Sequence, residues 1–500
     1  MKLSSAKVIA ALGLTVFLVG PLIALSEETE AEKVAASRAM RQELLNDPLR
    51  PLWHFVAPEG ICDPFDPNGA VYKDGVYHMW YIFQKDGKNL WEHVSSLDLL
   101  HWRWHSTILQ PHEGDPEIGI NSGSALTAPD GNVVISYQGV KAGICTVRSS
   151  DPDLNIWTKS QLNPVSPVVA DVHGWYENGR YYHITGGIPP RLFVGDAYDQ
   201  KLTEVGPFLT KNMPDVANYE DFSCPDFFKL GDKWVLLCLS HQRGVRYYVG
   251  TWDGKQFTPE SHHRMNWQGA NCFAPETLLD GQGRRIFWAY VYDQCKGLHS
   301  GTMTMPRVLT LADDKLSLKI NPAKELESLR YRPMSEEPFS IPAGDSVSLT
   351  NIKGNAIELD LVIDPQKAKR FGVTVFQSGD RREETPITVD LEHQTVTIDM
   401  KKSSLKQVKF YKYGFYNLPI PNEEITEQTA PITVLPDKKV RLRIFLDKSI
   451  MEVFVDDCQC VTQMVYTTLP DAVSVSVFAE DEAIKVDSAK AWELFPTNQW

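Results

Sequence analysis

The chain lacks an excess of positive charge, and beyond its N-terminus it lacks long apolar runs. Its 500 residues contain 50 Lys and Arg against 64 Asp and Glu, a formal net charge of −14 at pH 7. Nucleic acid and anionic membrane surfaces repel a protein of this charge, so we expect neither as a partner. A neutral substrate fits this composition better than a polyanionic one.

Cysteine and histidine are not grouped in the way that metal sites require. The eight cysteines are scattered between Cys62 and Cys460, and none stands with histidine at zinc-binding spacing. The spacing also shows no small disulfide framework. We therefore expect neither a metal nor a cofactor.

The one long apolar run stands at the N-terminus. Lys2 and Lys7 precede the uncharged stretch Val8–Leu25, and small residues follow near Ser26. This order is typical of a secretory signal peptide over residues 1–26, or of a signal anchor if the segment is retained. We expect an exported protein, periplasmic or extracellular, with residues 27–50 forming a charged helical or linking segment.

Helical periodicity is almost absent from the rest of the first half. Short β-rich runs alternate with Asp-Gly, Asn-Gly and Gly-Asp turns, as in VYKDGVYHMWYIF and GWYENGRYYHITGG. Such runs are typical of hairpins. Many regular hairpins without intervening helices favour a propeller of four-stranded blades over residues 51–315.

A second all-β unit follows a segment of different composition. Residues 316–336 are charged and linker-like, and strands with clean alternation then resume over residues 337–500. This pattern is best read as a β-sandwich. Its expected role is to brace the first domain, with carbohydrate binding as the alternative.

Asp66 stands at the start of the first hairpin, where Pro67 and Gly69 restrict the backbone. A carboxylate held at the mouth of a rigid strand suits a nucleophile in glycoside chemistry. The alternative is structural, since Asp in this position can also cap its own backbone as an Asx-turn.

Several short segments are informative through their order and spacing. They are Asp66-Pro67-Asn68-Gly69, Tyr77-His78 with Tyr81, Trp91 with His93, Ser122–Ala125, Cys224-Pro225-Asp226, Pro306-Arg307 and Arg441–Val455. Together they resemble glycoside hydrolase family 32, which contains invertases, inulinases and levanases. The resemblance covers nearly everything after the N-terminal segment, and it implies a five-bladed β-propeller followed by a C-terminal β-sandwich.

The resemblance also implies a reaction. Family members cleave fructosides with retention: one Asp attacks the anomeric carbon, a Glu protonates the leaving oxygen, and a second Asp binds sugar hydroxyls. Asp66 takes the place of the nucleophile. Asp171 lies where the family has Arg-Asp-Pro and takes the place of the stabilising Asp, although the Arg and Pro are absent; a loop-capping Asp is the alternative.

Two departures from the family pattern bear on activity. Asp63-Pro64-Phe65 replaces the Trp-Met-Asn that precedes the nucleophile, which changes the expected sugar pocket. Ser223 occupies the position of the acid/base Glu, and a serine hydroxyl cannot protonate a glycosidic oxygen at useful rates.

A nearby carboxylate could replace the missing acid. Asp221 is two residues from Ser223 and would share its face of a regular strand. Glu276 comes from the next blade, and Glu220 would face the cavity only if the strand bulges. The alternative for each is a solvated surface carboxylate. We rank Asp221 first and Glu276 second.

The resemblance further points to residues that would bind substrate, and the departures leave three functions open. The binding candidates are Asn68, Gln84, Trp91, Ser122, Ser223 and Cys224. We expect a β-fructosidase-like hydrolase that acts on a neutral oligo- or polysaccharide. The alternatives are a related five-bladed propeller glycosidase on another sugar, such as an arabinoside, and a catalytically inactive propeller that binds carbohydrate.

Overall fold

The computed structural model describes residues 29–58, 62–269, 271–292, 301–414, 421–434 and 438–498. It divides into two compact units, Met1–Gln42 and Glu43–Trp500. The segment 1–26, which we interpret as a signal, lies outside the described residues. No helix in the described part combines the length and the apolar character needed to cross a membrane.

The α-helix α1 (Glu30–Asn46), the single one among the residues described, falls within the segment for which the charge pattern predicted a helix or linker. Its first turn is closed by a reciprocal pair of hydrogen bonds. The Thr29 hydroxyl accepts from the backbone N–H of Glu32 at 3.3 Å, and the Glu32 carboxylate accepts from the N–H of Thr29 at 2.8 Å. This capping box explains why the helix begins here.

Five antiparallel sheets follow one another along the first half of the second unit. The first two comprise β1 (Pro67–Lys73), β2 (Val76–Lys85), β3 (Lys88–Ser96), β4 (Trp102–Leu109), β5 (Ile120–Thr127), β6 (Val133–Gly139), β7 (Gly143–Ser149) and β8 (Thr158–Lys159). The third and fourth comprise β9 (Val172–Glu177), β10 (Arg180–Thr185), β11 (Arg191–Gly195), β12 (Thr203–Pro207), β13 (Ser223–Leu230), β14 (Lys233–Ser240), β15 (Gly244–Trp252) and β16 (Phe257–Arg264). The fifth comprises β17 (Cys272–Leu279), β18 (Arg285–Val291), β19 (Thr302–Met303), β20 (Arg307–Leu311) and β21 (Leu318–Pro322).

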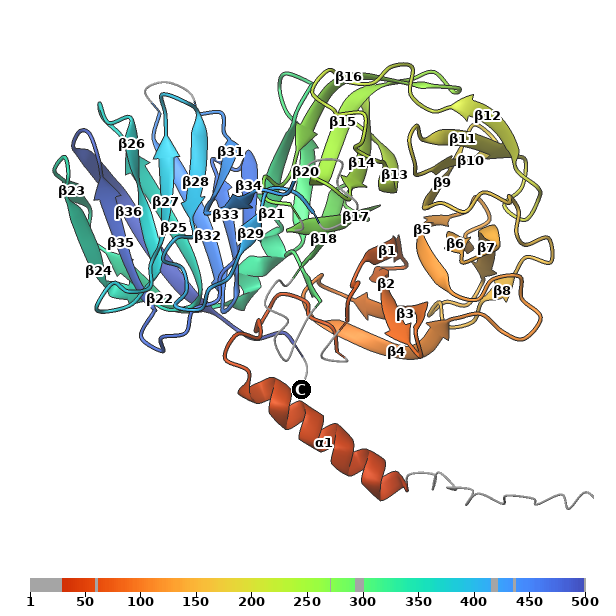
Figure 1. The fold of residues 1–500 in the computed structure, drawn as a ribbon, viewed down its shortest axis with the longest axis horizontal. Coiled ribbons are helices and arrows are strands. Elements are labelled where there is room, and N and C mark those ends of the chain that lie inside the picture. Colours follow the sequence, from red (N-terminus) through yellow and green to blue (C-terminus); the bar gives the residue numbers. More distant parts are fainter. Residues whose placement is uncertain are drawn as a thin grey trace, which may run out of the picture. The chain divides into compact units, whose positions relative to one another are not determined.

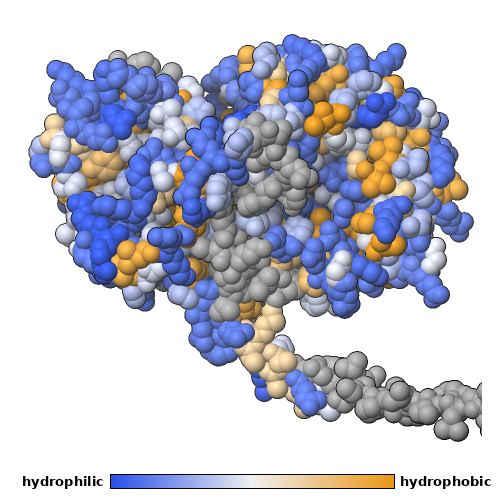
Figure 2. Space-filling model, in the orientation of Figure 1, coloured by the Kyte–Doolittle hydropathy of each residue, from blue (hydrophilic) through white to orange (hydrophobic). Residues whose placement is uncertain are grey.

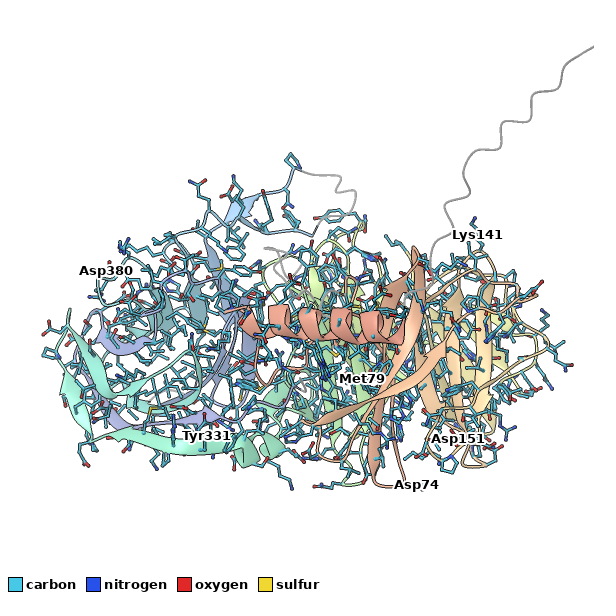
Figure 3. The ribbon with its side chains drawn as sticks, turned by 90° about the horizontal axis from the view of Figure 1, so that it is seen from below. Asp74, Met79, Lys141, Asp151, Tyr331 and Asp380 are labelled. Carbon is cyan, nitrogen blue, oxygen red and sulfur yellow. The ribbon has the colours of Figure 1, made fainter. Side chains whose placement is uncertain are left out.

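Two-residue turns join many of these strands, and their chemistry explains the hairpins. Asp74 and Gly75, between β1 and β2, have φ values of 50° and 88°. Asn178 and Gly179, between β9 and β10, have φ values of 49° and 84°. Asp, Asn and Gly tolerate this left-handed backbone, which the tight hairpin turn requires. Figure 3 shows Asp74 at the tip of its turn, whereas Met79 lies inside the first sheet and is 0% exposed.

The first strand of each sheet faces the centre of a closed ring (Figure 1). β1 contacts β5 and β17, β9 contacts β5 and β13, and β13 contacts β17. Four of these inner strands, β1, β5, β13 and β17, also carry a shift of register near their first residues. Such bulges redirect side chains, so simple alternation fails at this end of the ring.

The chain before β1 helps to close the ring. The N–H of Ala57 donates to the carbonyl of Gly301 at 3.0 Å, and the N–H of Met303 donates to the carbonyl of Phe55 at 2.9 Å. The segment preceding the first sheet is thereby paired with β19 of the last sheet. The ring is a five-bladed β-propeller.

A β-sandwich follows the short 3₁₀ helix Lys324–Leu329. Its seven-stranded sheet contains β22 (Arg330–Glu336), β23 (Phe339–Ile341), β25 (Ala356–Asp364), β32 (Val440–Asp447), β33 (Ile450–Val455), β34 (Gln459–Met464) and β36 (Ile484–Leu494). The six-stranded sheet contains β24 (Ser346–Lys353), β26 (Arg370–Gln377), β27 (Thr385–Asp390), β28 (Thr395–Asp399), β31 (Glu427–Pro431) and β35 (Ser474–Ala479), and β29 (Phe410–Tyr411) pairs with β30 (Glu424–Ile425). The prediction of an all-β fold, a five-bladed propeller followed by a sandwich, is confirmed.

The two β-domains share a buried, ion-paired interface. Arg307 of the propeller lies 2.9 Å from the carboxylate of Glu452 in the sandwich, and both side chains are almost fully buried. The N–H of Met305 donates to the same carboxylate at 3.0 Å. By contrast, the surface drawn in Figure 2 is mostly hydrophilic, with small scattered apolar areas of the kind found on most folded proteins.

Candidate active site

A cavity of about 280 Å³ lies at one end of the propeller, and all five sheets contribute to its wall. At or next to the starts of the inner strands it is lined by Asp66, Ser122, Asp171, Cys224 and Phe273. Residues from five separate parts of the sequence therefore meet around one space. Concave sites with a few convergent polar groups are where small molecules bind.

A larger cavity of about 460 Å³ lies on the six-stranded sheet of the sandwich. Two of its acidic residues are held by one cation, since Arg370 lies 2.7 Å from both Asp390 and Glu480. None of the residues predicted to act on substrate lines this space. The propeller cavity is therefore the candidate site.

Asp66 immediately precedes β1, and its backbone is held from two sides. Its carbonyl accepts from the N–H of Ile82 and from the side-chain amide of Asn68, both at 2.9 Å. The Asn68 carbonyl oxygen in turn accepts from the N–H of Gly123 at 3.0 Å. Asn68 is 2% exposed and does not line the cavity, so it joins the first two blades and positions Asp66 rather than facing a ligand.

Asp171 immediately precedes β9 and is tied to the fourth blade. Its carboxylate accepts from the N–H of Cys224 at 2.9 Å. Cys224 has a φ of 44° at the bulge of β13, and its sulfur lies 3.5 Å from the hydroxyl of Ser122. Asp171, Cys224 and Ser122 all line the cavity that Asp66 lines, as the sequence predicted for a common site.

The environment of Asp66 makes its negative charge less favourable than usual. Asp66 is half-buried on the cavity wall. Burial, together with the negative charges of Asp171 and Asp63, raises the pKa of Asp66 to about 7, although His241 opposes the shift. Carboxyl groups with pKa values displaced to this degree are concentrated at functional sites.

The substitution Asp63-Pro64-Phe65 adds a further acid to the cavity. Asp63 lines the wall and accepts a hydrogen bond from the Tyr290 hydroxyl at 3.2 Å. Burial and the charges of Asp63 and Asp66 raise the pKa of Tyr290 well above its usual value, so this phenol stays neutral and can donate. The departure from the family pattern therefore changes the polar groups that a sugar would meet.

The surroundings of Asp221 do not suit the proton-donating role that the sequence predicted for it. Its Oδ2 accepts from the Ser223 hydroxyl at 2.7 Å and from Nδ1 of His241 at 2.6 Å, and its Oδ1 accepts from the N–H of His241 at 3.0 Å. Burial raises its pKa, but the hydrogen bonds and charge of His241 outweigh burial and lower it overall. An ionised carboxylate cannot donate a proton, so Asp221 is a poor general acid. Ser223 is 8% exposed and does not line the cavity.

Glu220 is also held as an anion. Arg264 binds both of its oxygens at 2.9 Å, and Arg246 lies 3.3 Å away. Burial raises the pKa of Glu220, yet the two guanidinium groups lower it overall. This carboxylate is an internal ion-pair partner, not a proton donor.

Glu276 lies outside the cavity that contains Asp66. The bulge of β17 between Phe273 and Glu276 leaves Phe273 on the cavity wall and turns Glu276 away. Its carboxylate accepts from the N–H of Ala70 at 3.0 Å and lines a different space of about 430 Å³. Burial and the charge of Asp226 raise its pKa well above the usual value, as a general acid requires, but the group does not face the candidate site.

Two of the predicted binding residues do not line the cavity but contact residues that form its wall. Trp91 is 0% exposed and donates from its indole nitrogen to the carbonyl of Asn121 at 3.1 Å. Gln84 is exposed and donates to the side chain of Asn89 at 3.0 Å. Because Asn89 and Asn121 line the cavity and are hydrogen-bonded to each other at 2.9 Å, Trp91 and Gln84 support them from outside.

Sequence reasoning missed His241, which lines the cavity directly after β14. Its short polar neighbourhood, Ser240-His241-Gln242-Arg243, looks like any turn between strands. Proximity to Asp66 and Asp171 arises only when the ring closes and the first, third and fourth blades surround one cavity. The sequence offers one signal for His241, which is its position in the loop directly after a strand, because functional side chains are common in loops at strand ends.

Comparison with known proteins places these features in a family. The model of the glycosyl hydrolases family 32 N-terminal domain matches residues 54–322, and that of the family 32 C-terminal domain matches residues 325–493. A sucrose-6-phosphate hydrolase of Zymomonas mobilis is 26% identical, with 94% of this chain and 96% of that protein aligned. The insoluble β-fructofuranosidase isoenzyme 1 of Oryza sativa is 25% identical, with 93% of each chain aligned. The crystal structure of fructan 1-exohydrolase IIa from Cichorium intybus shares the fold, with a TM-score of 0.77, 19% identity, and coverage of 90% of this chain and 98% of that one.

Proposed function

The chain belongs to glycoside hydrolase family 32, and from that premise we propose that it hydrolyses fructosides with Asp66 as nucleophile. One observation carries the proposal. Asp66 and Asp171 come from different blades yet line one cavity, where the pKa of Asp66 is raised to about 7 by burial and by the charge of Asp171. Retaining glycoside hydrolysis requires a carboxylate next to the reacting carbon, and Asp66 supplies one as it ionises around pH 7.

The reaction proceeds in two steps. The Asp66 carboxylate attacks the anomeric carbon of the fructosyl group, and the bond to the leaving oxygen breaks as that oxygen takes up a proton. Asp171, anchored by the N–H of Cys224 at 2.9 Å, accepts hydrogen bonds from sugar hydroxyls next to the reacting carbon. Water then hydrolyses the covalent ester and regenerates Asp66, so the configuration is retained.

The charge of the cavity favours an uncharged substrate. Its wall carries Asp63, Asp66 and Asp171, and none of the described residues that line it is Lys or Arg. A sugar phosphate would bring its negative charge close to three carboxyl groups, and Arg or Lys is the usual partner of a bound phosphate. We therefore propose a neutral oligo- or polysaccharide as substrate.

A panel of sucrose, inulin, levan and aryl glycosides tests this function by release of reducing sugar. Hydrolysis of fructosides alone supports the proposal. Turnover of arabinosides instead would support the alternative of a related glycosidase that acts on another sugar. Asp63-Pro64-Phe65 is the reason for that alternative, because these residues reshape the pocket. Sugar binding without turnover would support an inactive carbohydrate-binding propeller, which the serine at position 223 favours.

We also propose that the protein is exported. The support is sequence alone: Lys2 and Lys7, the apolar run Val8–Leu25 and the small residues near Ser26. Mass spectrometry of the protein from its host provides the test. A mature N-terminus near Ser26 outside the cytoplasm supports a cleaved signal, whereas an intact Met1 in the membrane fraction supports an anchor, and an intact Met1 in the cytoplasm contradicts export.

A further inference from the structure

The proposed reaction needs a proton donor, and none of the three carboxylates near Ser223 supplies one. Asp221 and Glu220 are held as anions by His241 and by Arg264 and Arg246, respectively. Glu276 lines a different cavity. The donor must reach the oxygen of the leaving group, so it must face the same space as Asp66.

We infer that His241, held in place by Asp221, is the general acid and base of this enzyme and replaces the carboxylic acid that Ser223 lacks. The inference rests on the proposed function, because it assigns a role within that reaction. His241 lines the cavity together with Asp66 and Asp171. The other oxygen and nitrogen acids of the described wall are the aspartates and the two phenols, Tyr290 and Tyr292, and His241 is its one imidazole. An imidazole is the side chain whose ordinary pKa lies nearest to neutral pH, where a general acid and base must exchange protons.

The sheet places His241 next to the position of the missing acid. Ser223 on β13 pairs with Leu239 on β14, and His241 lies two residues beyond Leu239. Leu239 and His241 both line the cavity, as expected for residues two apart at the end of a strand. The imidazole therefore approaches the site from the strand beside Ser223.

Asp221 fixes the orientation of the ring. One carboxylate oxygen accepts from the backbone N–H of His241 at 3.0 Å and the other from Nδ1 at 2.6 Å. Ser223 donates to the second oxygen at 2.7 Å, which keeps the carboxylate in place. Because Nδ1 is directed at Asp221, Nε2 is the nitrogen on the opposite side of the ring. An Asp that orients a His in this way is a recurring arrangement in acid–base catalysis.

The surrounding charges favour the imidazolium form. Burial lowers the pKa of His241, but the hydrogen bond and charge of Asp221 and the charges of Asp171 and Asp66 outweigh burial and raise it overall. Cys224 and Tyr290 also line the cavity, and burial raises the pKa of each well above its usual value, so both stay neutral near pH 7. Asp63 and Tyr292 complete the titratable groups of the described wall. These charges therefore favour the protonated, proton-donating form of the ring.

The proton balance closes over one turnover. As Asp66 attacks the anomeric carbon, the electron pair of the breaking bond passes to the leaving oxygen, which takes the proton from Nε2. His241 is then neutral. In the second step it accepts a proton from the water that attacks the ester of Asp66, which restores the imidazolium and the Asp66 carboxylate. Asp221 remains ionised throughout and acts as a positioning residue.

The experiment compares leaving groups in His241→Ala. Sucrose has a poor leaving group that needs a proton, whereas nitrophenolate departs from a nitrophenyl fructoside without one. We expect kcat on sucrose to fall by roughly 10²–10⁴-fold, while the first step with the nitrophenyl fructoside changes little. A normal burst of nitrophenolate shows that the variant is folded, because only the second step of that reaction uses His241. The matched control is His101→Ala, since His101 also pairs with an aspartate, Asp98 at 2.7 Å, but is exposed on the first blade.

Two further variants sharpen the test. Asp221→Asn removes the charge that raises the pKa of His241, so the alkaline limb of kcat/KM on sucrose should move to lower pH. His241→Ala combined with Ser223→Glu restores a carboxylic acid at the family position and should recover part of the sucrose activity. A purely structural role of His241 would predict neither result.

The outcomes separate the inference from the proposed function. If the wild-type enzyme cleaves neither fructoside, the proposed function is wrong. If the wild type is active but His241→Ala loses the nitrophenolate burst as fully as it loses sucrose hydrolysis, or keeps sucrose activity, the function stands and the inference is overturned. A selective loss on sucrose supports the inference.

Discussion

Two sites in this chain, one buried and one half-buried, illustrate opposite uses of the carboxyl group. At the interface between the propeller and the sandwich, Glu452 accepts from Arg307 at 2.9 Å and from the N–H of Met305 at 3.0 Å. In the propeller cavity, Asp66 and Asp171 line one space together with His241.

The electrostatic results differ accordingly. Burial raises the pKa of Glu452, but Arg307 and His54 outweigh it and lower the pKa overall. The pKa of Asp66 is instead raised to about 7, because burial and the charge of Asp171 act in the same direction. A buried carboxylate that is paired with a cation, such as Glu452, can join two domains. A carboxylate that lies near a second carboxylate, such as Asp66, carries a poorly stabilised and therefore reactive charge.

The largest effect should come from Asp66→Asn. We expect kcat to fall by roughly 10⁴-fold or more, since no covalent route remains, while Tm stays unchanged or rises slightly because a repulsive charge is removed. The control is Asp74→Asn at the exposed tip of the β1–β2 turn, which should keep full activity. An Asp66→Asn enzyme with most of its activity would disprove the assignment of the nucleophile.

At the interface, Glu452→Gln should reduce stability and leave the chemistry intact. Removing the charge of Glu452 leaves the buried guanidinium of Arg307 without its anionic partner. Breaking a buried ion pair in this way costs about 3–5 kcal/mol of unfolding free energy. Denaturant unfolding measures the loss. Glu392→Gln is the matched control, since Glu392 pairs with Lys369 on the surface and should change stability by less than about 1 kcal/mol. Equal losses in the two variants would contradict the contrast between buried and exposed pairs.

Asp171→Asn should lower kcat/KM by roughly 10²–10³-fold, the range for removal of one electrostatic contact to a transition state. It should also shift the acid limb of the pH profile. In the wild type, activity rises with pH through about 7 as Asp66 ionises. The charge of Asp171 raises the pKa of Asp66, so its removal should move this limb to lower pH. An unmoved limb would show that the two acids do not interact.

The smallest effect concerns substrate charge. The acidic wall of the cavity predicts that sucrose is a better substrate than sucrose 6-phosphate, by at least about tenfold in kcat/KM at low ionic strength. The preference should shrink as salt is added, because salt screens the repulsion. Preference for the phosphorylated sugar would contradict the neutral-substrate proposal.

Much of the fold could be predicted because its signals are local. Asp74-Gly75 and Asn178-Gly179 adopt positive φ, and this requirement is visible in two adjacent letters of the sequence. The family resemblance located Asp66 and Asp171 through short motifs, and both line the cavity. The interface pair Arg307 and Glu452 lay within quoted motifs, but its partnership was not visible, because the two residues are 145 positions apart.

The sequence could not show that the environments of both predicted acids are unsuited to proton donation. The bulge of β17 between Phe273 and Glu276 turns Glu276 away from the cavity. Asp221 does lie beside Ser223, whose hydroxyl donates to it at 2.7 Å, but it is held as an anion. The identity of the neighbours then decides protonation. Asp221 is ionised because His241 comes from the next strand to meet it.

The sequence by itself determined the turns, the all-β class, the order of the two domains and the candidate nucleophile, because each depends on residues close together in the chain. Only the tertiary structure decided which acids share a cavity, which are neutralised by Arg or His, and which ring faces Asp66. Protonation depends on burial and on charges within a few ångströms, and in this propeller those charges come from different blades.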